Sequence, residues 1–198
     1  NIINASFTSL NGRPHAEYNA ITSSKINPKN SDLYVTLEPC SHYGKTPPCV
    51  NLIIKKKIKK VYFSVNDPDF RSNDKSSKIL RKKGISVNKG LFSKEINFFY
   101  KSYFKFKKEM FPYVTCKLAV SNDFYTINKK TKWITNNFSR GRVHLLRSFH
   151  DCLITSSSTV NSDNPLFTCR INGLNTTSPH VIILDNKLKL KKNSKILK

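Results

Sequence analysis

The sequence has few acidic residues, few glycines and no long apolar run. Its 198 residues contain 12 Asp and Glu against 35 Lys and Arg, which gives a formal net charge of +23. No apolar segment approaches the roughly 18 residues that a membrane-spanning helix needs. No leader with a basic, then apolar, then small-residue pattern opens the chain. These absences predict a cytoplasmic protein without a membrane segment.

Cysteine is also sparse, and its number is odd. The five cysteines are scattered over the chain, at Cys40, Cys49, Cys116, Cys152 and Cys169. A small disulfide-stabilised protein normally shows an even number of cysteines at close spacing. A disulfide framework is therefore not expected.

The excess of basic residues has two explanations. Clustered Lys and Arg side chains can bind the phosphate backbone of a nucleic acid. Here, however, lysine supplies most of the charge, asparagine is abundant, and alanine and glycine are scarce, as expected from a genome poor in G and C. Composition therefore favours a solvated basic surface over a nucleic-acid partner, because net charge says more about solubility than about function.

Short apolar runs alternate with segments of helical spacing, which predicts an α/β protein. In the first half, strands are expected at 33–37, 61–65 and 85–87, and helices after Pro47-Pro48, at 76–83 and at 94–108. In the second half, strands are expected at 113–120, 152–155 and 181–184, and a helix at 138–148. Because Phe111-Pro112 ends the helical pattern, we expect one domain at 1–108 and another at 111–198.

Both ends of the sequence suggest a fragment of a longer protein. The chain begins at Asn1 without a methionine, and it stops in a lysine-rich stretch straight after a predicted strand. We therefore expect the first domain to lack its N-terminal part and the second to lack its C-terminal part.

Four residues in the first half predict a catalytic zinc site. His15 and Glu17 form a His-x-Glu pattern, and Cys40 and Cys49 each follow a proline. One imidazole and two thiolates leave the fourth zinc position to water, as in catalytic rather than structural zinc sites. Zinc lowers the pKa of such a water, and Glu17 could move its proton to a leaving amine.

Each of these residues also has an ordinary structural explanation. A histidine near a helix start is often a cap, and a lone cysteine is usually a small buried hydrophobe. Cys49 nevertheless stands at the predicted start of a helix, where the helix dipole favours a thiolate. Because all four residues occur in this order, we predict that they form one site.

The segment between the two cysteines points to a small substrate. Nucleic-acid deaminases share the His-x-Glu and Pro-Cys-x-x-Cys pattern, but here eight residues separate Cys40 from Cys49. Within that segment, His42 and Lys45 would place cationic donors beside the metal. We expect these donors to bind a phosphate group on the substrate.

Residues 36–49 read Thr-Leu-Glu-Pro-Cys-Ser-His-Tyr-Gly-Lys-Thr-Pro-Pro-Cys. This segment strongly resembles the RibD family of bifunctional deaminase/reductases in riboflavin synthesis. The resemblance implies a cytidine-deaminase-like three-layer α/β/α domain. It also implies zinc-dependent deamination of 2,5-diamino-6-ribosylamino-4(3H)-pyrimidinone 5′-phosphate. By this resemblance the zinc ligands are His15, Cys40 and Cys49, the acid/base is Glu17, and the substrate contacts are His42, Lys45, Asp67 and Asp69. Asp69 stands where the family often has Asn, and residues 72–76 replace a glycine-containing segment.

The second half resembles the reductase of the same family. The matching segments are Pro112–Val114, Lys117–Ala119, Ser121 with Asp123, Trp133–Thr135, Val143–Arg147 and Thr159–Arg170. They imply part of a dihydrofolate-reductase-like α/β domain that uses NADPH to reduce 5-amino-6-(5-phosphoribosylamino)uracil to the ribitylamino product. The implied NADPH contacts are Ala119, Trp133, Thr159 and Asp163, and the implied substrate contacts are Arg147, Phe167 and Arg170.

The residues support part of this assignment and depart from the family elsewhere. A polar Ser/Thr loop after the strand at 152–155 could hold a cofactor phosphate through backbone N–H groups. The family's Ser-Leu-Asp-Gly, however, is Ser121-Asn122-Asp123-Phe124 here, and its Glu-Gly-Gly-like loop has no counterpart before the chain stops.

Two other functions remain open from the sequence. A tRNA or nucleotide deaminase would explain the basic charge, but it should have a short Cys-x-x-Cys segment and no reductase-like partner domain. A non-catalytic zinc-stabilised interaction domain would keep the ligands but would need neither Glu17 nor the loop with His42 and Lys45. The sequence also leaves a homo-oligomer open.

Overall fold

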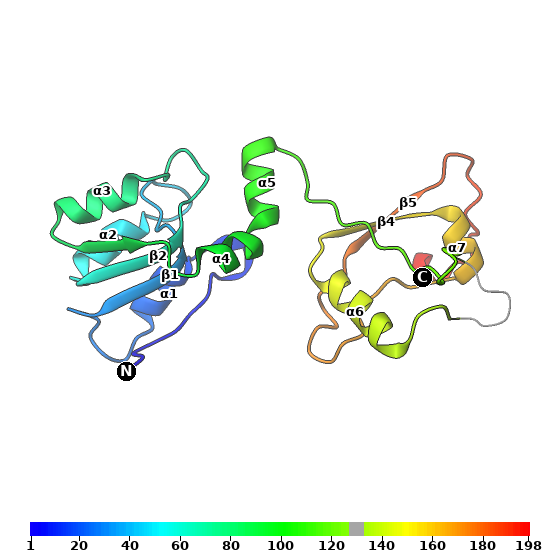
Figure 1. Cartoon of the computed structure of the whole chain (residues 1–198), viewed down its shortest axis with the longest axis horizontal. Coiled ribbons are helices and arrows are strands. Elements are labelled where there is room, and N and C mark those ends of the chain that lie inside the picture. Colours follow the sequence, from blue (N-terminus) through cyan, green and yellow to red (C-terminus); the bar gives the residue numbers. More distant parts are fainter. Residues whose placement is uncertain (127–132) are drawn as a thin grey trace. The chain divides into compact units, whose positions relative to one another are not determined.

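The protein is described by a computed structural model that covers residues 1–126 and 133–198. The chain forms two compact units, Asn1–Thr115 and Cys116–Lys198 (Figure 1). None of the helices in the described residues is long and apolar enough to cross a membrane.

The first unit is built on a three-stranded parallel sheet. Its strands are β1 (Asp32–Leu37), β2 (Lys60–Val65) and β3 (Ser86–Lys89), with β2 in the middle. Asp32 pairs with Lys60, and Lys60 pairs with Ser86, so the three strands start at the same edge. The connections are α2 (Cys49–Lys55) and α3 (Lys75–Lys82), because parallel strands need a crossover between them. These elements match the strands and helices expected from the sequence.

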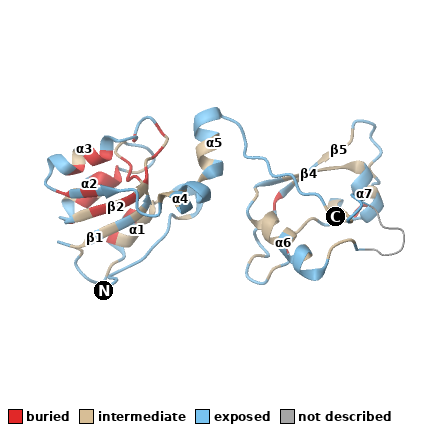
Figure 2. Cartoon of the chain, viewed as in Figure 1, coloured by how far each residue is buried: buried red, intermediate tan, exposed pale blue. Residues whose placement is uncertain are grey.

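One face of this sheet carries the core of the unit. Val61 and Phe63 of β2 alternate with half-buried residues and are fully buried, as a strand with one covered face requires. Side chains from α2, α3 and α1 (Ala16–Thr22) pack on this face, and Figure 2 shows the buried residues gathered there. The packed residues are Ile21, Val50, Ile53, Ile58, Val61, Phe63, Leu80, Ile85 and Val87.

Two helices follow β3, where the sequence predicted one. They are α4 (Ser93–Phe99) and α5 (Lys101–Glu109), and they meet at Tyr100. The Tyr100 hydroxyl lies 2.8 Å from Oγ1 of Thr36 on β1, which holds this residue at the sheet. The prediction of a continuous helix over 94–108 was therefore wrong, because this contact anchors Tyr100 where α4 ends and α5 begins.

The opposite face of the sheet is partly covered by α4, and Tyr34 on this face stays 61% exposed. Phe92 and Ile96 lie next to Tyr34, Tyr62 and Ser64. The rings of Tyr34 and Tyr62 stack with their centroids 4.6 Å apart. The sheet thus lies between α1–α3 and α4, which gives three layers.

The second unit contains a two-stranded parallel sheet. Its strands are β4 (Cys152–Ser156) and β5 (His180–Leu184), paired from Cys152 with His180 to Ser156 with Leu184. The helices of this unit are α6 (Asn137–Ser148) and α7 (Ser157–Asp163). Two single turns of 3₁₀-helix lie at Leu10–Gly12 in the first unit and Lys195–Leu197 in the second.

Two predictions for the second half were wrong. Residues 113–120 form no strand, because β4 and β5 pair with each other and the segment joins neither of them among the described residues. The Ser/Thr segment after β4 is not a loop but the helix α7. Ser156 starts this helix, since its hydroxyl accepts a hydrogen bond from the Thr159 amide.

Candidate functional site

The three predicted zinc ligands come together from two helix starts and one strand end. His15 is the residue before α1, Cys49 is the first residue of α2, and Cys40 follows β1 after Glu38-Pro39. Their ligand atoms all lie within 4.8 Å of one another. Cys40 is thus at the carboxyl end of a parallel strand, where open α/β sheets normally place their ligands.

The separations between these atoms fit a zinc ion. Nδ1 of His15 lies 3.5 Å from the Sγ atom of Cys40 and 3.5 Å from the Sγ atom of Cys49. In a tetrahedral site with ordinary Zn–N and Zn–S bonds, such ligand atoms lie about 3.5 Å apart. The amide of Cys49 also donates to the Cys40 sulfur at 3.2 Å, as it would to a thiolate.

The two thiols share one hydrogen bond, and this bond shifts their pKa values in opposite directions. The contact with Cys49 lowers the pKa of Cys40, and the contact with Cys40 together with burial raises the pKa of Cys49. One thiolate is therefore already favoured in this pocket. A thiolate is the form of cysteine that binds zinc.

Glu17 lies in the first turn of α1, two residues after His15, and its side chain is buried. Burial raises the pKa of the Glu17 carboxyl, because desolvation disfavours its charged form. The backbone hydrogen bond and the charge of His15 oppose this shift, and the charge of Cys40 adds to it. A carboxyl whose pKa is raised by burial holds a proton more readily than an exposed one, which suits a group that takes up and releases protons during a reaction.

The predicted phosphate-binding loop, residues 41–48, is held by hydrogen bonds near both of its ends. Nδ1 of His42 lies 2.9 Å from the hydroxyl of Ser72, a fully buried residue of the loop after β2. Thr46 accepts a 2.8 Å hydrogen bond from the Arg13 guanidinium, which holds the other end of the loop next to His15. Lys45 is exposed between these two anchors.

Asp67 and Asp69 follow the end of β2 and are both buried, but their carboxylates are already engaged. Asp67 accepts hydrogen bonds from the Asp69 amide and, at 3.0 Å, from the Tyr103 hydroxyl on α5. Asp69 accepts two hydrogen bonds from the Arg71 guanidinium, at 2.9 and 2.6 Å. The structure thus brings both residues to the carboxyl edge of the sheet that also holds Cys40.

The negative charge of the Asp69 carboxylate is stabilised by neighbouring cations. The hydrogen bonds from Arg71 hold the pKa of the Asp69 carboxyl far below its usual range, although burial alone would raise it. Lys107 of α5 adds a contact at 3.4 Å. Tyr103 and Lys107 could not be predicted at this loop from the sequence, because both lie more than 30 residues further along the chain.

In the second unit, the three predicted substrate residues gather around His144. Nδ1 of His144 and the Arg147 guanidinium both lie 3.0 Å from the Thr168 carbonyl oxygen. The Arg147 guanidinium lies 5.7 Å from the ring centre of Phe167, and Arg170 contacts Nε2 of His144 at 3.2 Å. His144 was not predicted as a site residue, but it stands three positions before Arg147 on α6, a spacing that puts both on one face.

This cluster carries excess positive charge. Burial, and then the neighbouring Arg170, lower the pKa of Arg147, and burial together with Arg147 lowers the pKa of His144. The buried Nε atom of Arg147 has no hydrogen-bond partner among the described residues. An anionic group would satisfy this donor and relieve the repulsion.

The four predicted NADPH residues lie in different parts of the second unit. Thr159 and Asp163 are on α7, which starts at the carboxyl end of β4. Ala119 is half-buried in the segment that forms no strand, and Trp133 stacks under the Arg140 guanidinium at 4.6 Å. The hydroxyl-rich start of α7 at a carboxyl strand end suits the phosphates of a dinucleotide.

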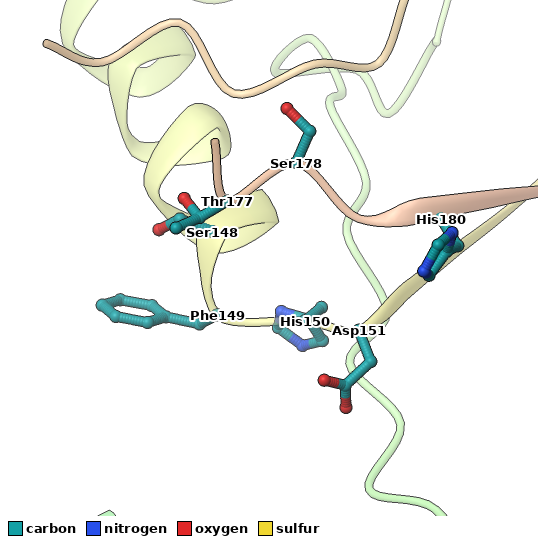
Figure 3. A pocket seen from close by; sticks show the side chains of 7 residues that line it. All are labelled: Ser148, Phe149, His150, Asp151, Thr177, Ser178 and His180. Carbon is teal, nitrogen blue, oxygen red and sulfur yellow. The ribbon is translucent and has the colours of Figure 1, made fainter. Parts of the chain in front are cut away.

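A cavity of about 430 Å³ lies elsewhere in the second unit (Figure 3). It is lined by Ser148, Phe149, His150, Asp151, Thr177, Ser178 and His180. Asp151 and His180 stand at the amino ends of β4 and β5, opposite to the edge where ligands bind in such sheets. None of the site residues predicted from the sequence, whether for zinc, substrate or NADPH, lines this cavity.

Comparison with known proteins identifies a similar family in each half. Residues 2–65 match the family described as "Cytidine and deoxycytidylate deaminase zinc-binding region". Residues 112–198 match the family described as "RibD C-terminal domain".

Curated relatives cover nearly the whole chain. "Riboflavin biosynthesis protein RibD" of Bacillus amyloliquefaciens is 39% identical over 188 residues, which is 94% of this chain and 50% of the relative. The protein of the same name from Buchnera aphidicola subsp. Baizongia pistaciae is 38% identical over 98% of this chain and 50% of the relative. The chain thus spans about half the length of the curated relatives it matches.

Solved structures show the same architecture. The chain is similar to Acinetobacter baumannii RibD, form 2, with a TM-score of 0.86, 32% identity, and coverage of 99% of this chain and 56% of that one. It is also similar to the diaminohydroxyphosphoribosylaminopyrimidine deaminase/5-amino-6-(5-phosphoribosylamino)uracil reductase of Thermotoga maritima. That match has a TM-score of 0.81 and 35% identity and covers 89% of this chain and 51% of that one. The predicted α/β class is confirmed.

Proposed function

Because this chain belongs to the RibD family, we propose that its first part, residues 1–108, is a zinc-dependent deaminase of riboflavin synthesis. The substrate is a small phosphorylated aminopyrimidine, 2,5-diamino-6-ribosylamino-4(3H)-pyrimidinone 5′-phosphate. The observation that carries this proposal is the convergence of His15, Cys40 and Cys49 beside the buried carboxyl of Glu17.

Each residue of the first site has a separate task in this reaction. His15, Cys40 and Cys49 would hold the zinc, which when bound activates a water molecule for attack on the ring carbon. Glu17 takes up a proton from the attacking water and gives one to the amino group, which leaves as ammonia. The raised pKa of Glu17 favours its uptake of that proton.

The loop residues bind and orient the substrate. The contact with Ser72 engages Nδ1 of His42, so Nε2 would be available to the substrate, and the exposed Lys45 would offer a positive charge to the phosphate. Asp67 and Asp69 would contact the substrate from the carboxyl edge of the sheet, where the Arg71 guanidinium pairs with Asp69 at 2.6 Å.

The second part of the chain, residues 111–198, belongs to an NADPH-dependent reductase in this proposal. Ala119, Trp133, Thr159 and Asp163 would hold NADPH, which when bound supplies a hydride. The substrate, 5-amino-6-(5-phosphoribosylamino)uracil, would meet the other three residues predicted from the sequence: Arg147, Phe167 and Arg170.

The observation that supports this second assignment is the cationic cluster around His144. The partnerless Nε donor of Arg147 and the neighbouring Arg170 suit the phosphate of the substrate.

The variant Glu17→Gln tests the deaminase assignment. It keeps the shape of the side chain but removes its acid/base function, so ammonia release should fall by about 10²- to 10⁴-fold while zinc stays bound. The matched control is Glu95→Gln, which changes an exposed residue on α4. It should leave both the rate of ammonia release and the zinc content unchanged.

Ammonia release and zinc content should be measured on the same zinc-loaded samples. Full turnover by the Glu17→Gln variant would contradict the proposed role of Glu17. Deamination of tRNA or single-stranded DNA in place of the phosphorylated pyrimidine would contradict the proposed substrate.

A further inference from the structure

Glu38 is a buried carboxylate to which the proposed mechanism assigns no task. It directly follows β1 and is joined through Pro39 to the zinc ligand Cys40. Its side chain is almost fully buried, at 2% exposure. Its backbone N–H donates to the Val65 carbonyl at 2.9 Å, which continues the pairing of β1 with β2 to this point. The start of the Glu38 side chain is therefore fixed relative to the sheet.

Within residues 1–126 and 133–198, four hydrogen bonds reach the Glu38 carboxylate, and all of them come from one segment, residues 67–76. Oε2 accepts from the amides of Asp67, at 3.4 Å, and Asp74, at 3.0 Å. Oε1 accepts from Ser76 twice, from its amide at 3.2 Å and from its hydroxyl at 2.7 Å. The donors are neutral and the acceptor is a carboxylate, so these are charge-assisted hydrogen bonds in a buried place.

Two of these contacts replace the missing cap of α3. Asp74 precedes α3 but adopts a left-handed conformation with φ of 56°, and its own side chain makes no capping bond. That side chain instead contacts Lys89, at 3.2 Å. Glu38 therefore satisfies the free amides at the start of α3 from a distant part of the chain, where a negative charge is also favoured by the helix dipole.

The segment that Glu38 holds also contains the residues around the proposed substrate. Asp67 and Asp69 lie in it, and Ser72 places the ring of His42. On its other side, Glu38 is two residues from Cys40. One side chain thus connects the zinc ligands to the substrate loop.

We propose that Glu38 is a positioning residue that sets the 67–76 loop in its place relative to the zinc ligands, and so determines substrate affinity. This proposal rests on the proposed deaminase function for its substrate. A carboxylate is needed because four donors converge on it, and the amide group of glutamine would turn N–H donors toward two of them.

The test compares substrate binding and loop order in zinc-loaded chains that carry Glu17→Gln to prevent turnover. Adding Glu38→Gln should raise the dissociation constant for the phosphorylated aminopyrimidine about tenfold, as measured by calorimetry. Zinc should remain at one ion per chain, and amide hydrogen exchange should become faster at residues 67–76. The matched control Glu95→Gln makes the same chemical change at an exposed residue of α4, and it should leave the dissociation constant unchanged.

A second variant covers the case in which Glu38→Gln does not fold. Ser76→Ala removes only the hydroxyl donor at 2.7 Å and keeps the other three contacts, so it should weaken binding by a smaller factor, about two- to fivefold. An unchanged dissociation constant with faster exchange would make Glu38 a purely structural cap and overturn the proposal. Loss of zinc would overturn it too, because Glu38 would then act on the metal ligands themselves.

These outcomes differ from a failure of the proposed function. If the chain with Glu17→Gln alone does not bind the phosphorylated aminopyrimidine, the proposed substrate is wrong. Hydrogen exchange then decides the role of Glu38 by itself: unchanged protection at residues 67–76 in the Glu38→Gln variant would overturn it, and lost protection there alone would support it.

Discussion

The contact between His42 and Ser72 gives the sharpest test of the substrate loop. Ser72 is fully buried, and its hydroxyl lies 2.9 Å from Nδ1 of His42. If this hydroxyl donates, the proton of the neutral ring is on Nε2, which can then donate to the substrate. Replacing Ser72 by alanine removes the partner of Nδ1 while changing the packing little.

The expected size of the effect follows from the loss of one hydrogen bond between neutral groups. Such a bond contributes about 0.5–1.5 kcal/mol. If the whole of it serves to orient His42 toward the substrate, the Ser72→Ala variant should raise KM about 2- to 12-fold with kcat little changed. A change in KM alone is expected when the lost interaction stabilised the bound substrate and the transition state by the same free energy.

Ser77→Ala is a matched control for this measurement. Ser77 is also a buried serine close by in sequence, but its hydroxyl has no hydrogen-bond partner among the described residues. The same chemical change should therefore leave KM unchanged and should not destabilise the chain. Steady-state ammonia release by both variants decides the matter. Equal KM values for Ser72→Ala and the unmodified chain, or an equal rise in both variants, would refute the reasoning.

Three further predictions concern the metal, the acidic loop and the phosphate. The double variant Cys40→Ser/Cys49→Ser should lose the one zinc per chain found by metal analysis, and zinc retained there would contradict the ligand assignment. Asp69→Asn should destabilise the chain to urea at pH 7, and by a smaller but still measurable amount at pH 3. Because the pKa of Asp69 is lowered in the folded chain, its pairing with Arg71 stabilises the fold fully above about pH 4, and the gain is lost only as the pH falls to the lowered pKa. Lys45→Ala should raise KM about tenfold for the phosphorylated substrate only, and an equal rise for the unphosphorylated nucleoside would exclude a phosphate contact.

The approach of Cys40 to Cys49 could be predicted from the sequence, because each stands at the boundary of an element that the sequence also predicts. Pro47-Pro48 marks the start of α2 at Cys49, and the apolar run of β1 ends just before Glu38-Pro39-Cys40. In a parallel sheet, a strand end and the start of the following helix lie at the same edge. Local signals alone were therefore enough to bring these side chains together.

The contacts that hold the loops could not be predicted in this way. Glu38 bonds to amides 29 to 38 positions away, and Tyr103 reaches Asp67 across 36 positions. These contacts depend on the path of an irregular loop, which has no hydrophobic period to indicate it. The break between α4 and α5 was missed for the same reason, because it depends on a contact of Tyr100 with Thr36 on the distant strand β1.

The acidic residue at position 69 is compatible with the proposed phosphorylated substrate. A carboxylate next to a phosphate site would repel the substrate, but Arg71 and Lys107 both contact the Asp69 carboxylate and more than neutralise it. Their hydrogen bonds leave the remaining charge positive, and Lys45 on the facing loop adds to it. Asp69 in place of Asn would therefore keep the attraction for the proposed phosphorylated substrate, and its ion pairs join α5 to the loop beside His15, Cys40 and Cys49.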